Sequence, residues 1–124
     1  MRAIVIDDSR AMRAILRKQL VSVGFDVIGE AVHGADALAR LKELGVPDLA
    51  LVDWNMPEMN GLEFVVAVRS NHDYDSMRLV MVTTETEFDQ VTLALAAGAN
   101  EYLMKPFTAD ALREKLALLG FEAH

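Results

Sequence analysis

The sequence contains no cysteine. Disulfides, thiol catalysis and zinc–thiolate sites are therefore excluded. Basic residues are also in the minority, with 12 Lys and Arg against 19 Asp and Glu, which gives a formal net charge of −7. A surface that binds duplex nucleic acid needs a basic footprint. The charge balance therefore argues against nucleic acid as a direct partner.

Long apolar runs are also missing. No run approaches the roughly 18 residues that a membrane span requires. The first apolar run, residues 3–6, meets Asp7 after four residues, which is too short for the core of a signal peptide. These absences predict a cytoplasmic protein without a membrane segment, and the length of 124 residues predicts one domain over residues 1–124.

Short apolar runs alternate with helical patterns along the chain. Runs that fit strands buried on both faces occur at 3–6, 27–31, 49–52, 79–82 and 102–104. Apolar residues at helical spacing follow each run, in segments that begin near residues 9, 37, 61, 88 and 109. Asp8 and Ser9 are alternative caps for the first helix. Five alternations with short connections predict parallel strands joined by right-handed crossovers, hence a doubly wound three-layer α/β domain.

The same pattern predicts the burial of individual residues. Ile15 is expected on the apolar side of the first helix, Val66 in the core under the third helix and Leu95 on the apolar side of the fourth. His33, His72 and His124 are expected to be surface histidines in loops or at the end of the chain.

Polar residues stand where four of the five predicted strands end. They are Asp7 and Asp8, Asp53, Thr83, and Lys105. Ligands of doubly wound sheets bind beyond the carboxyl ends of the strands, at the switch point, so these side chains are expected to converge. The strand that ends near Ala31 supplies nothing comparable, which suits an edge position.

Three carboxylates at one edge repel each other, since two unit charges about 4 Å apart cost roughly 4 kcal/mol at an effective dielectric near 20. A divalent cation relieves this repulsion, and Mg²⁺ is normally held by one or two carboxylates, waters and a phosphate. Such a cation also leaves one carboxylate able to attack a phosphoryl group and form an acyl phosphate. Lys105 would clamp one phosphoryl oxygen and the Thr83 hydroxyl would donate to another.

Four segments carry a family resemblance, namely 5–9, 51–57, 81–84 and 102–107. In order and spacing they resemble the receiver domains of two-component response regulators, over essentially the whole chain. Asp53-Trp54-Asn55-Met56-Pro57 and the position of Tyr102 resemble most the single-domain, CheY-like members. The resemblance implies a flavodoxin-like (βα)5 fold with the strand order 2-1-3-4-5.

The resemblance also implies a metal site. Asp53 is the expected phosphoacceptor. Asp8, Asp53 and the backbone carbonyl of Asn55 are the expected Mg²⁺ ligands, and Asp7 is expected to act mainly through water.

Phosphoryl binding and switching involve a second set of residues by the same resemblance. Lys105 binds the phosphoryl group, and the bond from Lys105 to Pro106 is expected to be cis. Thr83 and Tyr102 resemble the switch pair: Thr83 moves toward the phosphoryl oxygen and Tyr102 fills the vacated space. The change then reaches the face made by the fourth helix, fifth strand and fifth helix.

The implied function is a stand-alone signalling protein that catalyses only its own phosphorylation and dephosphorylation. The phosphodonor is expected to be a CheA-like histidine kinase. Only residues 107–124 follow Pro106, so no output domain is expected and a monomer would signal by binding a partner. A flagellar motor switch protein is the first choice. The alternative is a relay shuttle or phosphate sink that exchanges the group with a histidine phosphotransfer domain.

Smaller features bear on lifetime and partner choice. Glu58 is expected to shape access to the site. Asn55 and Glu85 resemble the polar pair of members whose phosphoryl group is short-lived. Partner choice is expected to depend on the first helix and on residues near the fourth, including Glu87.

Three other classes of protein agree less well with the sequence. An aspartyl-phosphate-type hydrolase needs Asp-x-Asp after the first strand, where this chain has Asp7-Asp8-Ser9. A flavodoxin-like cofactor carrier needs a first loop that cradles a phosphate, which Asp7 and Asp8 would repel. A P-loop nucleotidase needs Gly-Lys-Ser/Thr after the first strand, and the sequence has none there.

Overall fold

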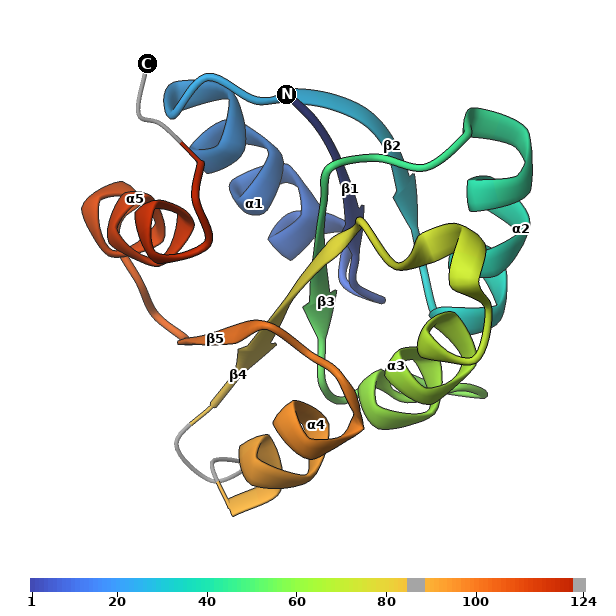
Figure 1. Cartoon of the computed structure of the whole chain (residues 1–124). Helices are drawn as coiled ribbons and strands as arrows, with labels where there is room; N and C mark the ends of the chain where they lie inside the picture. The colour runs from blue at the N-terminus through green and yellow to red at the C-terminus, as the bar shows by residue number, and fades with distance from the viewer. Residues whose placement is uncertain (85–88, 122–124) are drawn as a thin grey trace.

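A computed structural model describes residues 1–84 and 89–121 and shows a parallel sheet between two layers of helices (Figure 1). The strand order is β2-β1-β3-β4-β5. The strands are β1 (Arg2–Ile6), β2 (Asp26–Ala31), β3 (Leu49–Asp53), β4 (Arg78–Thr83) and β5 (Glu101–Met104). The predicted three-layer fold and its strand order are confirmed, with β2 at one edge.

The helices divide into two layers. One face of the sheet is covered by α1 (Arg10–Ser22) and α5 (Ala109–Leu118), and the other by α2 (Gly34–Leu44), α3 (Gly61–Arg69) and α4 (Val91–Ala97) (Figure 1). A short 3-10 helix, η1 (His72–Tyr74), precedes β4. Within the part of the chain that the structure describes, no helix combines the length and apolar character needed to cross a bilayer.

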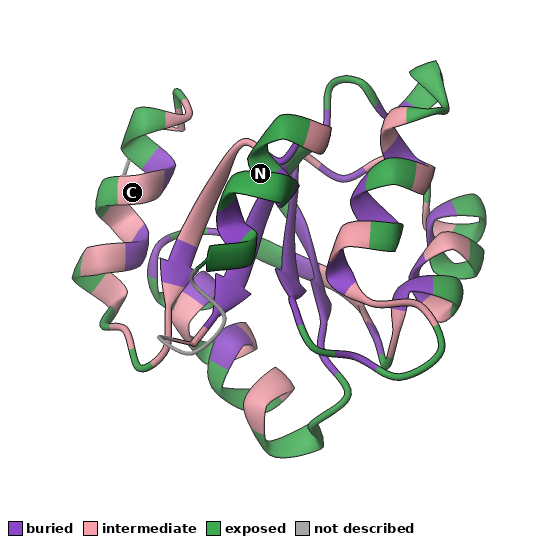
Figure 2. Ribbon diagram, turned by 90° about the horizontal axis from the view of Figure 1, so that it is seen from below, coloured by how far each residue is buried: buried purple, intermediate pink, exposed green. Residues whose placement is uncertain are grey.

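The central strands are buried on both faces, which explains why they read as unbroken apolar runs. All five residues of β3 are buried, and Figure 2 shows the strands as the buried centre of the molecule. Because side chains alternate across a strand, Leu49 and Leu51 pack with α1 and α5, whereas Ala50 and Val52 pack with α2, α3 and α4. One strand thus contributes to two cores.

Side-chain caps set where the helices begin. Of the two candidate caps for α1, Ser9 is the one used, and its hydroxyl accepts from the Met12 N–H at 3.2 Å. Asn60 and Glu63 form a reciprocal capping box at α3, with bonds of 2.9 and 3.1 Å.

Three predicted core positions are wrong in detail. Ile15 of α1, Val66 of α3 and Leu95 of α4 are exposed. Successive residues of a helix point 100° apart, so only some of the apolar residues on each helix face the sheet. In α4 the buried residues are Val91 and Ala94. Phe88, the expected start of the fourth helix, lies outside the described residues.

The Arg69 guanidinium joins the end of α3 to two later connections. It donates to the carbonyls of Tyr74 (2.9 Å), Met77 (2.7 Å) and Gly98 (2.9 Å), and to Asn100 Oδ1 (2.9 Å). Burial lowers the pKa of Arg69. The backbone segments before β4 and before β5 are therefore held by one side chain.

Replacing Arg69 by alanine should lower the free energy of unfolding by about 3 kcal/mol, because several carbonyl acceptors lose a charged donor. Equilibrium urea unfolding measures the change. Arg113→Ala is the matched control, since Arg113 lies on the outside of α5 and pairs only with Asp110 among the described residues. The control should stay within about 0.5 kcal/mol of wild type. Equal losses in the two variants would contradict the role assigned to Arg69.

Candidate functional site

Three carboxylates and one ammonium group meet at the carboxyl edge of the sheet. Asp7 and Asp8 follow β1, Asp53 ends β3 and Lys105 follows β5. One oxygen from each of Asp7, Asp8 and Asp53 lies within 4.8 Å of the others. The structure therefore brings together the four charged residues that were predicted to converge.

Lys105 is held between two of the carboxylates. Its Nζ lies 3.2 Å from Asp53 Oδ1 and 3.5 Å from Asp7 Oδ2. Burial alone would lower the pKa of Lys105. The two carboxylates raise it by more, so the pKa lies above the ordinary value for a lysine. The backbone of Lys105 is fixed as well: its N–H donates to the Thr83 carbonyl at 2.7 Å, and the Lys105–Pro106 peptide bond is cis.

Asp7 is oriented from both sides. Its side chain is 1% exposed, and its Oδ1 accepts from the Ser9 N–H at 2.8 Å. The Asp7 carbonyl accepts from Arg13 Nη1, also at 2.8 Å. Asp8, by contrast, is exposed. Asp7 is therefore a buried acceptor already engaged by protein donors, and Asp8 is the carboxylate open to solvent.

The backbone around Asp53 is closely packed. The Trp54 N–H donates to the Val82 carbonyl at 3.0 Å, and the Gly61 N–H donates to the Trp54 carbonyl at 2.9 Å. A Cβ at Gly61 would lie 2.9 Å from the Asp53 carbonyl oxygen and 3.0 Å from Trp54 Cα. Glycine at this position is therefore what allows α3 to begin against the strand end that carries Asp53.

The Asp53 carboxyl is an unusually weak acid for an aspartate. Its pKa rises from 3.8 to about 6, first because the group is buried and next because Asp7 repels its charge. Lys105 acts in the opposite direction, and Asp8 adds a smaller repulsion. A cation beside Asp53 would relieve the same penalty.

The oxygen set fits a hard divalent cation such as Mg²⁺. Asp8 and Asp53 offer carboxylate oxygens, and Asn55 stands two residues after Asp53 in an exposed part of the loop. Asp7 is occupied by Ser9 and Lys105, which suits a contact through water. Further ligands would then be waters, as is usual for Mg²⁺.

Thr83 and Tyr102 lie on the same face of the sheet. Thr83 follows the alternation of Leu79 and Met81, which pack with α2, α3 and α4, and the Tyr102 ring packs against the same cluster. Thr83 is buried, and its hydroxyl donates to the Thr84 carbonyl at 3.3 Å. Tyr102 is half-buried, with Lys115 Nζ 4.2 Å from its ring centroid.

His33 was expected to be a surface histidine, but it has two defined roles in the structure. Its Nδ1 accepts from the Asp36 N–H at 3.0 Å and caps α2, and its Nε2 lies 3.2 Å from Glu58 Oε2. Asp36 in the first turn is an acidic residue of the kind enriched at helix starts, but nothing local indicates the contact of His33 with Glu58. Glu85, Glu87 and His124 lie outside the described residues.

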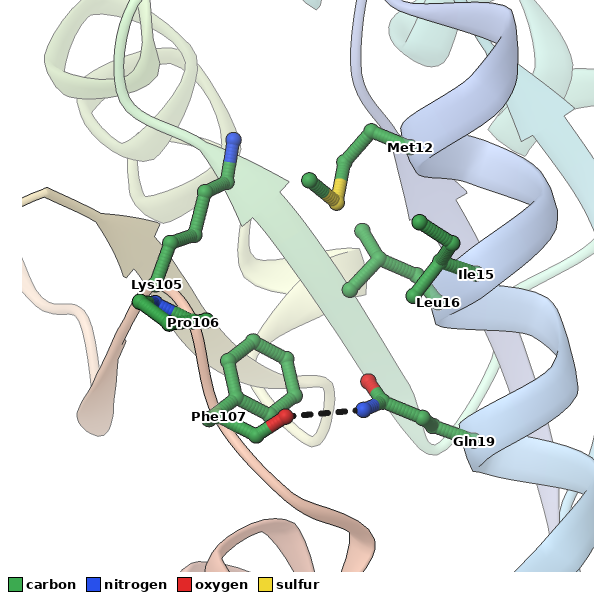
Figure 3. Close-up of a pocket in the computed structure, with 7 residues that line it drawn as sticks. All are labelled: Met12, Ile15, Leu16, Gln19, Lys105, Pro106 and Phe107. Atoms are coloured by element: carbon green, nitrogen blue, oxygen red, sulfur yellow. Dashed lines mark hydrogen bonds between the residues drawn. The ribbon is translucent and has the colours of Figure 1, made fainter.

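A pocket of about 310 Å³ opens beside Lys105, between α1 and the segment after β5 (Figure 3). Its lining is mainly apolar and includes Met12, Ile15 and Phe107. Gln19 closes one end and donates from Nε2 to the Phe107 carbonyl at 2.9 Å. The side chain of Ile15 is half exposed beside this pocket.

Comparison with known proteins decides the family. A family model described as the response regulator receiver domain matches residues 3–117. The chain belongs to the response regulator receiver family. Its relatives include a chemotaxis protein CheY homolog of Campylobacter jejuni, 46% identical over 116 residues, or 94% of this chain and 89% of that protein. Chemotaxis protein CheY1 of Helicobacter pylori is 41% identical over 119 residues, 96% of each chain.

Solved structures agree with this assignment. The chemotaxis response regulator CheY4 of Vibrio cholerae superposes with a TM-score of 0.84 at 34% identity, over 95% of this chain and 97% of that one. The family and the fold predicted from the four sequence segments are thus confirmed, and the chain is a CheY-like receiver domain of two-component signalling.

The raised pKa of Asp53 predicts a pH-dependent effect of Asp53→Asn on stability. The ordinary pKa of 3.8 applies to the unfolded chain and about 6 to the folded one, so ionisation costs free energy only in the folded state. Wild type therefore loses stability as pH rises from about 4 to about 6. The amide variant escapes this loss and should be more stable by about 1–2 kcal/mol at pH 7.5, but not at pH 4.

Urea unfolding in the presence of a chelator measures this difference. Asp26→Asn is the control, because Asp26 is exposed at the opposite end of the sheet. A gap that is the same at both pH values, or equal in the control, would contradict the assigned electrostatics.

Proposed function

We propose that this chain is a chemotaxis-type response regulator that accepts a phosphoryl group on Asp53 from a CheA-like histidine kinase. The observation that carries the proposal is the position of Asp53: a buried carboxylate 3.2 Å from a lysine ammonium, inside a cluster of three carboxylates. The CheY-named relatives support the chemotaxis assignment.

Phosphoryl transfer at this site forms one bond and breaks one. An ionised Asp53 oxygen attacks phosphorus, the P–N bond of the donor's phosphohistidine breaks, and the imidazole leaves with the bonding electron pair. The pKa of about 6 leaves Asp53 largely ionised at neutral pH. Lys105, already in contact with the carboxylate, would then pair with a phosphoryl oxygen.

The metal role belongs to Asp8, Asp53 and the carbonyl of Asn55, with Asp7 acting through water. Mg²⁺ held there would offset the charge that gathers between the attacking carboxylate and the phosphoryl oxygens. Attack by water on the acyl phosphate returns Asp53 and inorganic phosphate. In this proposal the protein catalyses only its own phosphorylation and dephosphorylation and acts as a signalling phosphoacceptor.

The output of the switch is proposed at the face formed by α4, β5 and α5. Thr83 and Tyr102 pack on the same side of the sheet, so movement of the Thr83 hydroxyl toward the phosphoryl group would open space for the Tyr102 ring. Leu93 and Leu95 of α4 are exposed, so this helix presents apolar side chains to a partner. A flagellar motor switch protein is the proposed partner of a monomeric, cytoplasmic regulator.

The segments aligned with this chain cover 89% and 96% of the two CheY-named relatives. Those relatives leave little room for an output domain, which supports the proposal of signalling by partner binding. A relay with a histidine phosphotransfer domain is the second candidate. The pocket beside Lys105 is compatible with this candidate, since its apolar surface adjoins Lys105 and suits a docking phosphotransfer protein, but the kinase of the first proposal would use the same surface.

Incubation with a small phosphodonor and Mg²⁺ should add one alkali-labile, phosphate-sized increment to the intact mass. Asp53→Ala should abolish the increment, because no other carboxylate in the cluster has the same contact with Lys105 and the same position at the end of β3. Asp26→Ala is the control and should be modified like wild type. An increment that persists in Asp53→Ala, or none in wild type, would contradict the proposed phosphoacceptor.

Ile15→Glu should slow phosphotransfer from a phosphorylated CheA-like kinase by about tenfold or more, because a carboxylate replaces an apolar contact beside the pocket. The rate with a small phosphodonor should be unchanged. Val21→Glu, at an exposed position of the same helix outside the pocket, is the matched control. Rapid-quench autoradiography follows the transfer, and equal rates for the two variants would argue against docking on this face.

A further inference from the structure

The loop between β3 and α3, residues 54–60, contains a strained turn. The Met59 N–H donates to the Pro57 carbonyl at 2.7 Å, which makes a γ-turn centred on Glu58. Glu58 has φ of 63°, and among the described residues it is the one non-glycine with positive φ. This form of γ-turn is rare and costs free energy unless the surroundings hold it. The contacts of the turn therefore matter.

His33 reaches this turn from the N-terminus of α2. Because Nδ1 accepts from the Asp36 N–H, the neutral ring carries its proton on Nε2. That nitrogen lies 3.2 Å from Glu58 Oε2 and can donate to it. The His33 side chain is only 20% exposed, whereas that of Glu58 is 71% exposed. The cap of α2 thus fixes the tautomer and the direction of the donor.

The next residue of each segment forms a second contact. The Gly34 N–H donates to the Met59 carbonyl at 3.3 Å. A Cβ at Gly34 would lie 2.6 Å from Met59 Cγ, so the Met59 side chain packs directly on the glycine. His33 and Gly34 therefore hold Glu58 and Met59 as adjacent pairs, and the loop is joined to α2 at two places.

We propose that His33 and Glu58 form a clasp that positions the β3–α3 loop for Mg²⁺ binding. The inference rests on the proposed metal site, to which the loop contributes the Asn55 carbonyl. Asn55 lies between Trp54, whose backbone is bonded to β4, and Met56, which is buried. The backbone from Asn55 to Glu58 sets the direction of that carbonyl, and release of the turn would let it change. His33 is a positioning residue, since it would act on the Asn55 carbonyl through Glu58 and the backbone of the loop.

Magnesium titration monitored by Trp54 fluorescence tests the clasp, since Trp54 is the only tryptophan in the sequence and adjoins Asp53. His33→Asn keeps a short acceptor for the α2 cap but is too short to reach Glu58. Glu58→Ala removes the acceptor, and Glu58→Gln keeps an oxygen. The first two should weaken Mg²⁺ affinity by on the order of tenfold, while Glu58→Gln stays within about twofold of wild type.

The double variant His33→Asn/Glu58→Ala should have the same Mg²⁺ affinity as whichever single variant binds Mg²⁺ less tightly, because the two substitutions remove the same interaction. His72→Asn is the control for histidine replacement, since the His72 side chain is 92% exposed and lies beside Asp75, three residues later in the chain. Thermal unfolding separates a local effect from a general loss of stability. In metal-free protein, hydrogen exchange of the Gly34 amide should accelerate in His33→Asn.

Two outcomes distinguish this inference from the proposed function. Unchanged Mg²⁺ affinity in His33→Asn and Glu58→Ala, or an equal loss in Glu58→Gln and Glu58→Ala, would overturn the clasp and leave the metal site standing. Wild-type protein that binds no Mg²⁺ would overturn the metal site, and the clasp's function with it.

Discussion

The contact between the Lys105 ammonium and the Asp53 carboxylate governs the chemistry of the whole sheet edge. One lysine contacts two of the three carboxylates, so the edge retains excess negative charge after the ion pairs have formed. In a partly buried setting that excess is costly. This excess negative charge lies at the carboxyl edge of the sheet, where Asp8 is exposed and a cation can enter. The carboxylates whose repulsion destabilises the fold are therefore the same residues that form the proposed metal site.

Because side chains alternate along each strand, the two helical layers pack on different residues of the same sheet. The layer of α1 and α5 packs on Leu49 and Leu51, and its α1 side borders the pocket beside Lys105. The other layer contains the core against which Tyr102 packs. A donor protein approaching α1 and a partner approaching α4 would thus meet different layers of one sheet. The Asp53 site lies at the edge shared by both.

Much of this arrangement could be predicted from the sequence, because it depends on local patterns. Buried parallel strands read as apolar runs, and the polar residues that follow them meet at one edge whatever the details of packing. Helix faces were less predictable: Ile15, Val66 and Leu95 are apolar yet exposed, because their neighbours already fill the stripe that meets the sheet.

Contacts between distant segments could not be predicted in this way. Arg69 donates to the Gly98 carbonyl, and His33 reaches Glu58; neither partner is indicated by spacing, because the fold alone brings these segments together. The tight approach of α3 to the end of β3 adds a consequence. With Gly61 against the Asp53 carbonyl and Trp54 bonded to β4, the main chain at the proposed phosphoacceptor has little room to move. A signal that started at this proposed site would therefore pass mainly through side-chain rotations. Such a switch sets the fraction of molecules in each state rather than turning every molecule on, so the cell would read it as a graded occupancy of the partner.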